Sequence, residues 1–555
     1  MRFQTLIKNI AKIIKKPYVL GLLLVLVIWG SYFLFIWPKM VSHDEDGIKA
    51  WGYARFDWTV HFAYAGVFAY QPIKNWFESH PLYYDTQFSY PFLADALSGL
   101  LIRQGSSYVN AFLIPSVITS IILVLMLYTL YFFVLKKPEK AVVAISLFFT
   151  TGGLGFIWFI KNWIHENGNT ALRAVSYYTQ MADKNIEWLN IFPGELIPQR
   201  AFLLGLPVTL FVILVLWRWF QNDFKTASPI KLILLGITGS MVMLIHVHSY
   251  MVLINISAIF SIYTRQHWRK WLIFALAAAL PSFIFYVAFY GNHLETNHMN
   301  RFFFWNPGGF MTKNETFGDW LYFWILNWGL FFPLALWTSF RKKMFLKNPL
   351  ILTALVLFIA ANLIQFQPNS WDNAKIFTWS YLLFSIPIAE FIVSLWQKRL
   401  IGKIVSVLIF FTLTFSGGLD LIKLSLTNPK YNGVIINNED ILLAEKFRAI
   451  TQPEDLVLTS GKNDHWVATH TGRRILWGEK AFLWTYGIDT NPPEQDVKKM
   501  FAGGEEAKML LAHYSIDLAV IGPTEISEYQ ANENFFKENY ELILQSNQYA
   551  IYKIE

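Results

Sequence analysis

The sequence predicts an α-helical polytopic membrane protein that carries a small α/β domain after its last membrane helix. Of its 555 residues, 54% are hydrophobic and only 15% are charged, whereas soluble proteins average roughly 25% charged residues. Apolar runs such as 17–37 and 109–135 have the length of about 20 residues that a spanning helix needs. From residue 424 the composition becomes mixed and polar. We therefore assign residues 1–423 to a transmembrane domain and residues 424–555 to a soluble domain.

The N-terminal segment predicts the orientation of the first span. Residues 1–16 contain several lysines, one arginine and no acidic residue, and the apolar run 17–37 follows directly. This order resembles a signal peptide, but no small-residue cleavage site follows the run. We expect a retained first span with the N-terminus in the cytoplasm, because cytoplasmic segments are enriched in lysine and arginine.

Basic clusters between the later apolar runs predict the remaining spans. They lie at 136–140, 218–231, 265–270, 341–343 and 398–403. If all are cytoplasmic, the runs pair as out-and-back hairpins and give about eleven spans with the C-terminus outside. The spans are expected near 18–37, 109–135, 141–160, 201–217, 230–246, 249–264, 271–290, 319–339, 350–366, 376–396 and 403–423. The split near residue 246 follows because 230–263 is too long for one helix between two basic flanks.

This topology leaves three loops and the C-terminal domain on the outer side of the cell membrane. The loops are the long first one, 38–108, and two others at 161–200 and 291–318. In the C-terminal domain, short β-rich runs at 455–459, 516–521 and 549–554 alternate with helical stretches such as 505–514. This alternation indicates a small α/β domain.

Several functional classes are excluded. The net charge is +8, but the basic residues cluster in short loops and there is no nucleic-acid-binding motif, so nucleic acid is not an expected partner. The chain contains no cysteine, which excludes disulfides, thiolate metal sites and cysteine nucleophiles. It also lacks a convincing P-loop, Rossmann glycine pattern, Gly-x-Ser-x-Gly or zinc-protease motif.

Polar residues gather at the predicted outer ends of the helices. Among the twelve histidines, only His267 falls in a predicted cytoplasmic loop. Ionisable groups near a membrane are costly and usually functional. The alternative is that the outer loops are polar simply because they are the long ones.

Acidic residues of the first outer loop are the candidates for a catalytic base. Asp57 and His61 are four residues apart, which places them on one helical face. Such a pair could hold a metal or orient the imidazole, although a simple ion pair gives the same spacing. Asp44, Glu45 and Asp46 crowd three carboxylates after the first span. One could act as a base, and Asp44, Asp46 and Asp57 could bind a divalent cation such as Mg²⁺ or Mn²⁺; the alternative is a solvated acidic turn.

Basic residues at the outer helix ends are the candidates for binding an anion. Arg200, Arg301 and Lys375 fall at the ends of different spans, and their side chains could grip a phosphate or merely reach the lipid headgroups. His246 and His248 could pair on a metal or on substrate, or be satisfied histidines at a helix end. The sequence alone leaves both choices open.

Taken together, these features resemble the type C glycosyltransferase superfamily, which includes protein O-mannosyltransferases, aminoarabinose transferases and the catalytic subunits of oligosaccharyltransferases. The closer resemblance is to uncharacterised bacterial and archaeal members. The segments that carry it are Asp57-Trp-Thr-Val-His61, Tyr90-Pro-Phe-Leu-Ala-Asp95, Pro198-Gln-Arg-Ala-Phe202, Trp371-Asp-Asn-Ala-Lys375 and Thr471-Gly-Arg473. The outer domain has no Trp-Trp-Asp acceptor motif, so transfer to an Asn-x-Ser/Thr sequon is not expected.

The resemblance implies an inverting glycosyltransferase of the cell envelope. It would transfer a hexosyl or pentosyl group from a polyprenyl-phosphate donor to a glycan, lipid or protein acceptor at the outer membrane face. Asp57, helped by His61, is the first candidate for the base, followed by Asp44 and Asp46. The substrate-binding candidates, to which the resembling segments add two, are Arg200, Arg301, Lys375, Asp372, His246, His248 and Tyr90. No cofactor is required, although a divalent cation could assist.

Three other readings fit parts of the pattern. A transporter or flippase for lipid-linked sugars would explain the spans, but transporters usually bind substrate near the membrane midplane. A polysaccharide polymerase or ligase would also be multi-span and face outward. A sensor with a ligand-binding outer domain would leave the acidic first loop unexplained.

Overall fold

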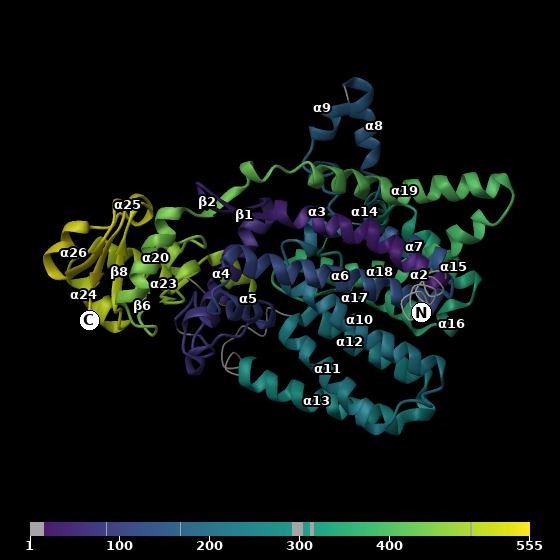
Figure 1. The fold of residues 1–555 in the computed structure, drawn as a ribbon, viewed down its shortest axis with the longest axis horizontal. Coiled ribbons are helices and arrows are strands. Elements are labelled where there is room, and N and C mark those ends of the chain that lie inside the picture. The colour runs from purple at the N-terminus through teal and green to yellow at the C-terminus, as the bar shows by residue number, and fades with distance from the viewer. Residues whose placement is uncertain (1–15, 85, 167, 291–302, 311–315, 489–490) are drawn as a thin grey trace, which may run out of the picture.

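The computed structural model describes residues 16–84, 86–166, 168–290, 303–310, 316–488 and 491–555. The protein is mostly helical, and its long helices run side by side along one axis (Figure 1). The N-terminal helix α2 (Pro17–Val25) begins at one end of this layer. The C-terminal strands and short helices lie beyond the other end.

Six helices of the described part are long and apolar enough to cross a membrane: Pro17–Met40, Tyr108–Leu135, Arg200–Gln221, Arg265–Phe289, Ser370–Trp396 and Leu400–Ser425. The first consists of α2, the π-helical turn η1 (Leu26–Gly30) and α3 (Ser31–Met40). The others contain α6 (Tyr108–Leu135), α10 (Arg200–Gln221), α13 (Trp268–Tyr290), α18 (Ala374–Trp396) and α19 (Leu400–Ser425). Helices α14 (Phe317–Trp328) and α15 (Phe331–Arg341) form a seventh candidate, bent by 95°.

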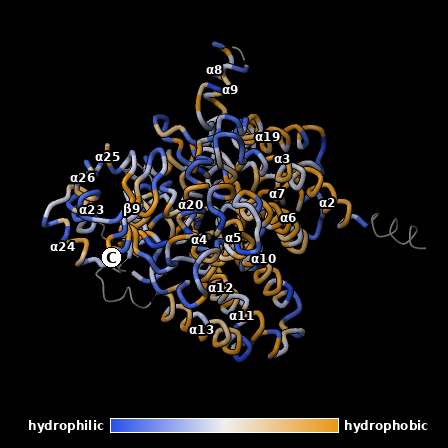
Figure 2. The backbone as a smooth tube through the Cα atoms, turned by 60° about the vertical axis from the view of Figure 1, so that its left-hand side comes forward, coloured by the Kyte–Doolittle hydropathy of each residue, from blue (hydrophilic) through white to orange (hydrophobic). Residues whose placement is uncertain are grey.

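Three shorter apolar helices, α11 (Pro229–Ile245), α12 (Val247–Tyr263) and α17 (Pro349–Leu363), coincide with three further predicted runs. The prediction of a multi-span helical membrane protein is therefore confirmed in its coarse form, whereas the count of about eleven full spans is not. Figure 2 shows hydrophobic residues dominating the long helices and a mixed distribution in the C-terminal part. On α13, Leu272, Leu276 and Leu280 are 49–64% exposed, so this face needs lipid as its solvent.

The run predicted as one span over 141–160 instead forms two helices, α7 (Pro138–Phe149) and α8 (Phe156–His165). The turn between them is rich in glycine and is pressed against other backbones. A Cβ atom on Gly153 would lie 2.0 Å from the carbonyl oxygen of Leu326, and one on Gly155 would lie 1.6 Å from that of Tyr178. The break is therefore set by contacts with distant segments. The hydropathy of the sequence does not report such contacts.

The predicted split near residue 246 is confirmed. Helix α11 ends at Ile245, and His246 adopts an extended conformation before α12 begins at Val247. The Nδ1 atom of His246 accepts the backbone N–H of Ser249 at 3.2 Å, which satisfies one of the free donors at the start of α12.

The segment 38–108, predicted as the first outer loop, is ordered by a hairpin and two helices. Strands β1 (Val41–Asp44) and β2 (Gly47–Ala50) form the hairpin, and β2 also pairs with β5 (Gly433–Ile436) beyond α19. Helices α4 (Gly52–Tyr70) and α5 (Leu93–Arg103) pack so closely that a Cβ on Gly99 would lie 2.4 Å from a carbonyl oxygen of α4. The start and the end of the transmembrane part are thus joined through one small sheet.

The C-terminal segment contains a five-stranded sheet of order β7-β6-β8-β10-β9. Its central strands β6 (Leu456–Leu458) and β8 (Leu518–Ile521) are parallel, and every residue of both is buried. The other strands are β7 (Arg474–Ile475), β9 (Glu541–Gln545) and β10 (Ala550–Lys553). The helices are α20 (Asn438–Ile450), α21 (Trp466–His470), α22 (Lys480–Thr485), α23 (Asn491–Ala502), α24 (Glu505–His513), α25 (Pro523–Tyr529) and α26 (Glu533–Asn539).

The three β-rich runs and the helix at 505–514 predicted for this segment are present. The domain boundary at residues 423 and 424 stays a prediction. Short elements complete the described chain: α9 (Gly168–Arg173), α16 (Met344–Lys347), β3 (Phe304–Trp305), β4 (Ile364–Gln365), η2 (Ile73–Asn75), η3 (Ala182–Lys184), η4 (Phe192–Leu196), η5 (Arg265–His267), η8 (Ser370–Asn373) and η9 (Pro429–Tyr431).

Candidate functional site

A cavity of about 730 Å³ lies between the segment that follows the first membrane helix, the ends of several later helices and the C-terminal segment. Its walls come from α4, the π-helical turn η4, the junction of α11 and α12, the start of α18, and α22. Pockets for small ligands typically measure about 300–1,000 Å³. Membrane helices, first loop and C-terminal segment therefore share one space of the size that a ligand needs.

The cavity brings together residues that are far apart in the sequence. The sequence-predicted candidates that line it are Asp57, His61, Tyr90, His246, His248, Asp372 and Lys375. Their roles remain predictions, but their convergence on one space is a property of the fold.

Asp57 is the lining carboxylate best suited to accept a proton. Burial raises its pKa to about 6, while the nearby His61 and Lys375 lower it and Asp372 raises it. A carboxylate with a pKa near 6 is a stronger base than an ordinary aspartate and is still mostly ionised at neutral pH. Helix α4 places Asp57 outside the membrane spans, on the face that lines the cavity.

His61 is held by Asp95 and not, as the four-residue spacing suggested, by Asp57. The Nδ1 atom of His61 lies 2.9 Å from Oδ2 of Asp95. The other carboxylate oxygen of Asp95 accepts a hydrogen bond from Arg200 at 3.1 Å, and Asp95 is fully buried. The contact from α5 therefore fixes the imidazole ring while its other edge lines the cavity.

Arg200 lies at the start of α10, the helix end where it was expected, but it is not among the residues that line the cavity. Its guanidinium is buried against Asp95 and Ser98 and lies 3.9 Å over the ring of Phe112. Its charge is balanced by Asp95, so it serves to hold Asp95 and, through it, His61. Arg301, the third predicted anion-binding residue, lies outside the described residues.

Asp44 and Asp46 are also not at the cavity. They lie at the turn of the β1–β2 hairpin, where Lys49 pairs with Asp44 at 3.0 Å and with Asp46 at 2.5 Å. The expected metal set of Asp44, Asp46 and Asp57 is not assembled. In the described ranges, no group of three or more histidine, aspartate or glutamate side chains could hold a metal ion. Asp44, Asp46 and Asp57 therefore do not form a site for a divalent cation.

Lys375 and the two histidines form the electropositive side of the cavity. Lys375 donates a hydrogen bond to Asp372 at 2.7 Å, and both side chains are largely buried. The rings of His246 and His248 lie 5.4 Å apart. Their Nε2 atoms are buried and have no hydrogen-bond partner among the residues that the structure describes.

The hydrogen bonds of His246 fix its tautomer. Its Nδ1 atom lies 2.9 Å from the hydroxyl of Ser249 and accepts the backbone N–H of the same residue. The proton of the neutral ring is therefore on Nε2. An N–H donor beside the Lys375 ammonium group suits a ligand that carries negative charge.

Glu195 is a site residue that the sequence analysis missed. It lies in η4, next to Pro193 and Gly194, which line the cavity. Both of its carboxyl oxygens are buried without a hydrogen-bond partner in the described ranges. Burial raises its pKa to about 8, Lys375 lowers it, and Asp372 and Asp57 raise it. The sequence feature that could have indicated Glu195 is that it is the single acidic residue in the apolar stretch 188–198.

Fold and cavity define the class: a multi-span membrane protein with a ligand-sized cavity, containing carboxylates and cations, at one end of its helices. No protein-family model matches the chain, and a search of curated proteins finds no match.

Solved structures with a similar arrangement include the oligosaccharyltransferase of Archaeoglobus fulgidus, tethered with an acceptor peptide containing the NVT sequon. The identity is 12%, the TM-score is 0.48, and the match covers 92% of this chain and 70% of that one. For the archaeal oligosaccharyltransferase AglB from the same organism, in complex with an inhibitory peptide and a dolichol-phosphate, the identity is 14% and the TM-score is 0.43. This match covers 91% of this chain and 69% of that one. For ArnT from Cupriavidus metallidurans bound to undecaprenyl phosphate, the identity is 10% and the TM-score is 0.47. This match covers 97% of this chain and 98% of that one.

With identities of 10–14% and TM-scores below 0.5, these likenesses assign neither a family nor a role to this chain. The chemical role of each residue follows from its own contacts in this structure.

Proposed function

We propose that this protein is a glycosyltransferase that moves a sugar from a polyprenyl-phosphate donor to an acceptor at the outer face of the cell membrane. The observation that carries the proposal is the shared cavity: Asp57, a carboxylate with a raised pKa, lines the same space as Lys375, His246 and His248. A base and an anion-binding group in one cavity are what this transfer requires. The type of donor follows from the sequence resemblance.

The proposed transfer needs only these residues, the donor and the acceptor. The acceptor hydroxyl gives its proton to Asp57, and its oxygen forms a bond to the anomeric carbon. The bond from that carbon to the phosphate oxygen breaks, and the polyprenyl phosphate leaves with the electron pair. A direct displacement of this kind inverts the configuration of the sugar. General-base assistance is worth about 10² to 10⁴ in rate.

The departing phosphate gains charge, and the electropositive side stabilises it. Lys375 supplies a point charge, and the Nε2–H of His246 supplies a hydrogen bond that becomes stronger as that charge develops. Asp372 holds Lys375 in place through their 2.7 Å hydrogen bond. Preformed donors of this kind need little rearrangement during the reaction.

The position of the cavity favours transfer over transport. Transporters usually bind substrate near the midplane, between their repeats. Here α22 of the C-terminal segment forms part of the cavity wall together with loops beyond the helix ends. A polysaccharide polymerase or ligase would use the same chemistry on a larger transferred unit.

The test is transfer of label from a defined donor. The purified protein in nanodiscs is supplied with radiolabelled polyprenyl-phosphate hexoses and pentoses and with an extract of cell-envelope material. We expect label from one donor to move from the lipid to the extract. If every donor stays intact while its headgroup crosses the bilayer of proteoliposomes, the protein is a transporter and the proposal is wrong.

A further inference from the structure

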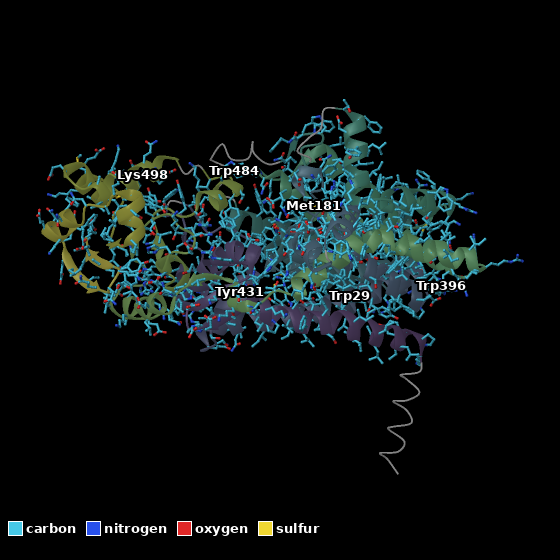
Figure 3. All side chains as sticks on the ribbon, turned by 90° about the horizontal axis from the view of Figure 1, so that it is seen from above. Trp29, Met181, Trp396, Tyr431, Trp484 and Lys498 are labelled. Carbon is cyan, nitrogen blue, oxygen red and sulfur yellow. The ribbon has the colours of Figure 1, made fainter. Side chains whose placement is uncertain are left out.

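One wall of the cavity is built from aromatic rings. Phe56 of α4 and Phe482 of α22 stack with ring centroids 4.7 Å apart, and Trp484 and Tyr53 line the cavity beside them. Phe56 is 48% exposed, Trp484 43% and Tyr53 41%. Figure 3 shows Trp484 near the junction between the membrane helices and the C-terminal part. We call Tyr53, Phe56, Phe482 and Trp484 the aromatic platform.

Uncharged hydrogen-bonding groups accompany these rings. The hydroxyl of Tyr53 donates to the side-chain oxygen of Gln180 at 2.8 Å, and Gln180 lines the cavity. Gln199 and Asn369 line it as well. The side-chain oxygen of Gln367, another lining residue, is buried and has no partner in the described part of the chain. Amide groups can donate and accept hydrogen bonds at once.

Fixed charge is scarce on these walls. Among the described lining residues, the acidic and basic side chains other than histidine are Asp57, Asp372 and Lys375. Asp372 and Lys375 pair with each other, and Asp57 has the role of base. The platform therefore offers no charge to bind an ionic headgroup or a charged peptide side chain.

Exposed rings and amides that line one cavity match the chemistry of a carbohydrate. A sugar ring carries an apolar face of C–H bonds, which stacks on an aromatic ring, and a rim of hydroxyls, which exchange hydrogen bonds with amides. We propose that the acceptor is a saccharide held on the aromatic platform. This inference rests on the proposed function for the transfer step, but the binding is independent of it.

The platform can be assigned to the acceptor rather than to the sugar of the donor. The donor must keep its polyprenyl chain in the membrane, and its phosphate belongs beside Lys375 and His246, at the ends of α18 and α11. Residues Phe482 and Trp484 come from α22 in the C-terminal segment, and Trp484 lies near the junction of this segment with the membrane helices (Figure 3). An acceptor that arrives from the water side meets this wall first.

The test measures binding without turnover. The full chain in nanodiscs is examined by saturation-transfer-difference NMR with methyl glycosides of trisaccharides of glucose, mannose, galactose and N-acetylglucosamine. Serine-, threonine- and asparagine-containing peptides and a short-chain phosphatidylcholine are separate arms. We expect at least one trisaccharide to bind through its C–H protons, and Trp484→Ala to weaken that binding about tenfold, with Trp484→Phe restoring part of it.

A matched control is Trp163→Ala on α8, a tryptophan that is 55% exposed and does not line the cavity. It should leave saccharide binding unchanged. The inference is overturned if only peptides or phosphatidylcholine bind, if saccharides bind only as sugar phosphates, or if Trp484→Ala and Phe482→Ala both bind like the wild type. Label transfer to a peptide or lipid without saccharide binding would defeat this inference alone. Saccharide binding without any transfer would support it and count against the proposed function.

Discussion

Residue pairs of the same chemical type acquire different roles here because their neighbours differ. Asp57 lies in the cavity with its pKa raised by burial, whereas Asp44 lies at an exposed turn where a hydrogen bond from Lys49 lowers its pKa. Lys375 lines the cavity, whereas Arg200 is buried against Asp95. Each contrast leads to an experiment.

Asp57→Asn should reduce transfer by about 10² to 10⁴, because the amide cannot accept the proton of the acceptor. In the wild type, kcat/KM should fall about tenfold per pH unit below pH 6, since Asp57, with its pKa of about 6, is protonated there. Asp46→Asn, at the hairpin, should retain transfer. The measurement is initial rate against pH, and full activity of Asp57→Asn would return the role of base to Asp44 or Asp46.

Lys375→Ala and Arg200→Ala should have opposite profiles. Loss of Lys375 removes a charge-assisted contact with the phosphate and should raise the KM for the donor about ten- to a hundredfold. Loss of Arg200 removes the cationic partner of the buried Asp95, which then keeps only His61, and should lower stability by about 3 kcal/mol. Donor kinetics and thermal unfolding in detergent separate the two. A normal melting temperature with a raised KM in Arg200→Ala would instead place this residue at the phosphate.

Glu195→Gln should change how stability depends on pH. The unfolded chain loses the Glu195 proton near its ordinary pKa of 4.5, whereas the folded protein keeps it to about pH 8. The free energy of unfolding therefore falls between these pH values in the wild type, and glutamine removes this loss. We expect the variant to melt above the wild type at pH 8.5 by the equivalent of a few kcal/mol, and close to it at pH 5. Equal differences at both pH values would show that Glu195 has a partner that keeps it ionised.

At the level of elements, helices end where other backbones approach closely rather than where hydropathy falls. Helix α7 stops before a glycine-rich turn that is closed by Leu326, Tyr178 and α19. The bend between α14 and α15 has a different basis: Gly329 between them has a positive φ of 59°, which glycine adopts at low cost.

Two adjacent glycines of α19 provide a matched test of this packing. A Cβ on Gly417 would lie 2.3 Å from the carbonyl oxygen of Thr150, whereas a Cβ on Gly418 meets nothing within 4 Å. Gly417→Ala should therefore destabilise the protein, because backbone must move. Gly418→Ala should be neutral or stabilising by up to about 1 kcal/mol, since alanine favours helix. The measurement is the thermal unfolding temperature of both variants. Equal stabilities would mean that α7 and α19 do not meet at this point.

At the scale of the whole molecule, α2 and the C-terminal strands lie toward opposite ends (Figure 1). The basic clusters after α15 and between α18 and α19 are at the same end as α2, as Figures 1 and 3 show. From the positive-inside rule we predict that this end faces the cytoplasm and that the cavity and the C-terminal segment face outward.

Reporter fusions test that orientation. Alkaline phosphatase joined after Glu555 should be active and green fluorescent protein at the same place should be dark, because only an outer C-terminus gives this combination. The same two reporters placed after residue 222, in a basic loop, should show the reverse. A fluorescent C-terminal fusion would place the cavity on the cytoplasmic side and remove the basis for a donor site at the outer face.

The sequence by itself determined the features that depend on local composition. Apolar length and basic loops identify the long helices, and the basic flanks of 230–263 place the break at His246. Short polar motifs identify Asp57, Lys375 and the histidines, because ionisable groups at a membrane surface are costly enough to be conspicuous in a chain this apolar.

Only the tertiary structure decided which of these residues share a space. Asp95 contacts both His61 and Arg200, and Lys49 pairs with Asp44 and Asp46 at a hairpin away from the cavity. Glu195 and Trp484 lie near or at the cavity although their segments carry no recognised motif. The physical reason is that a carboxylate, a cation or an exposed ring is defined by its partners. In this fold the decisive partners come from distant segments, so spacing along the chain does not reveal them.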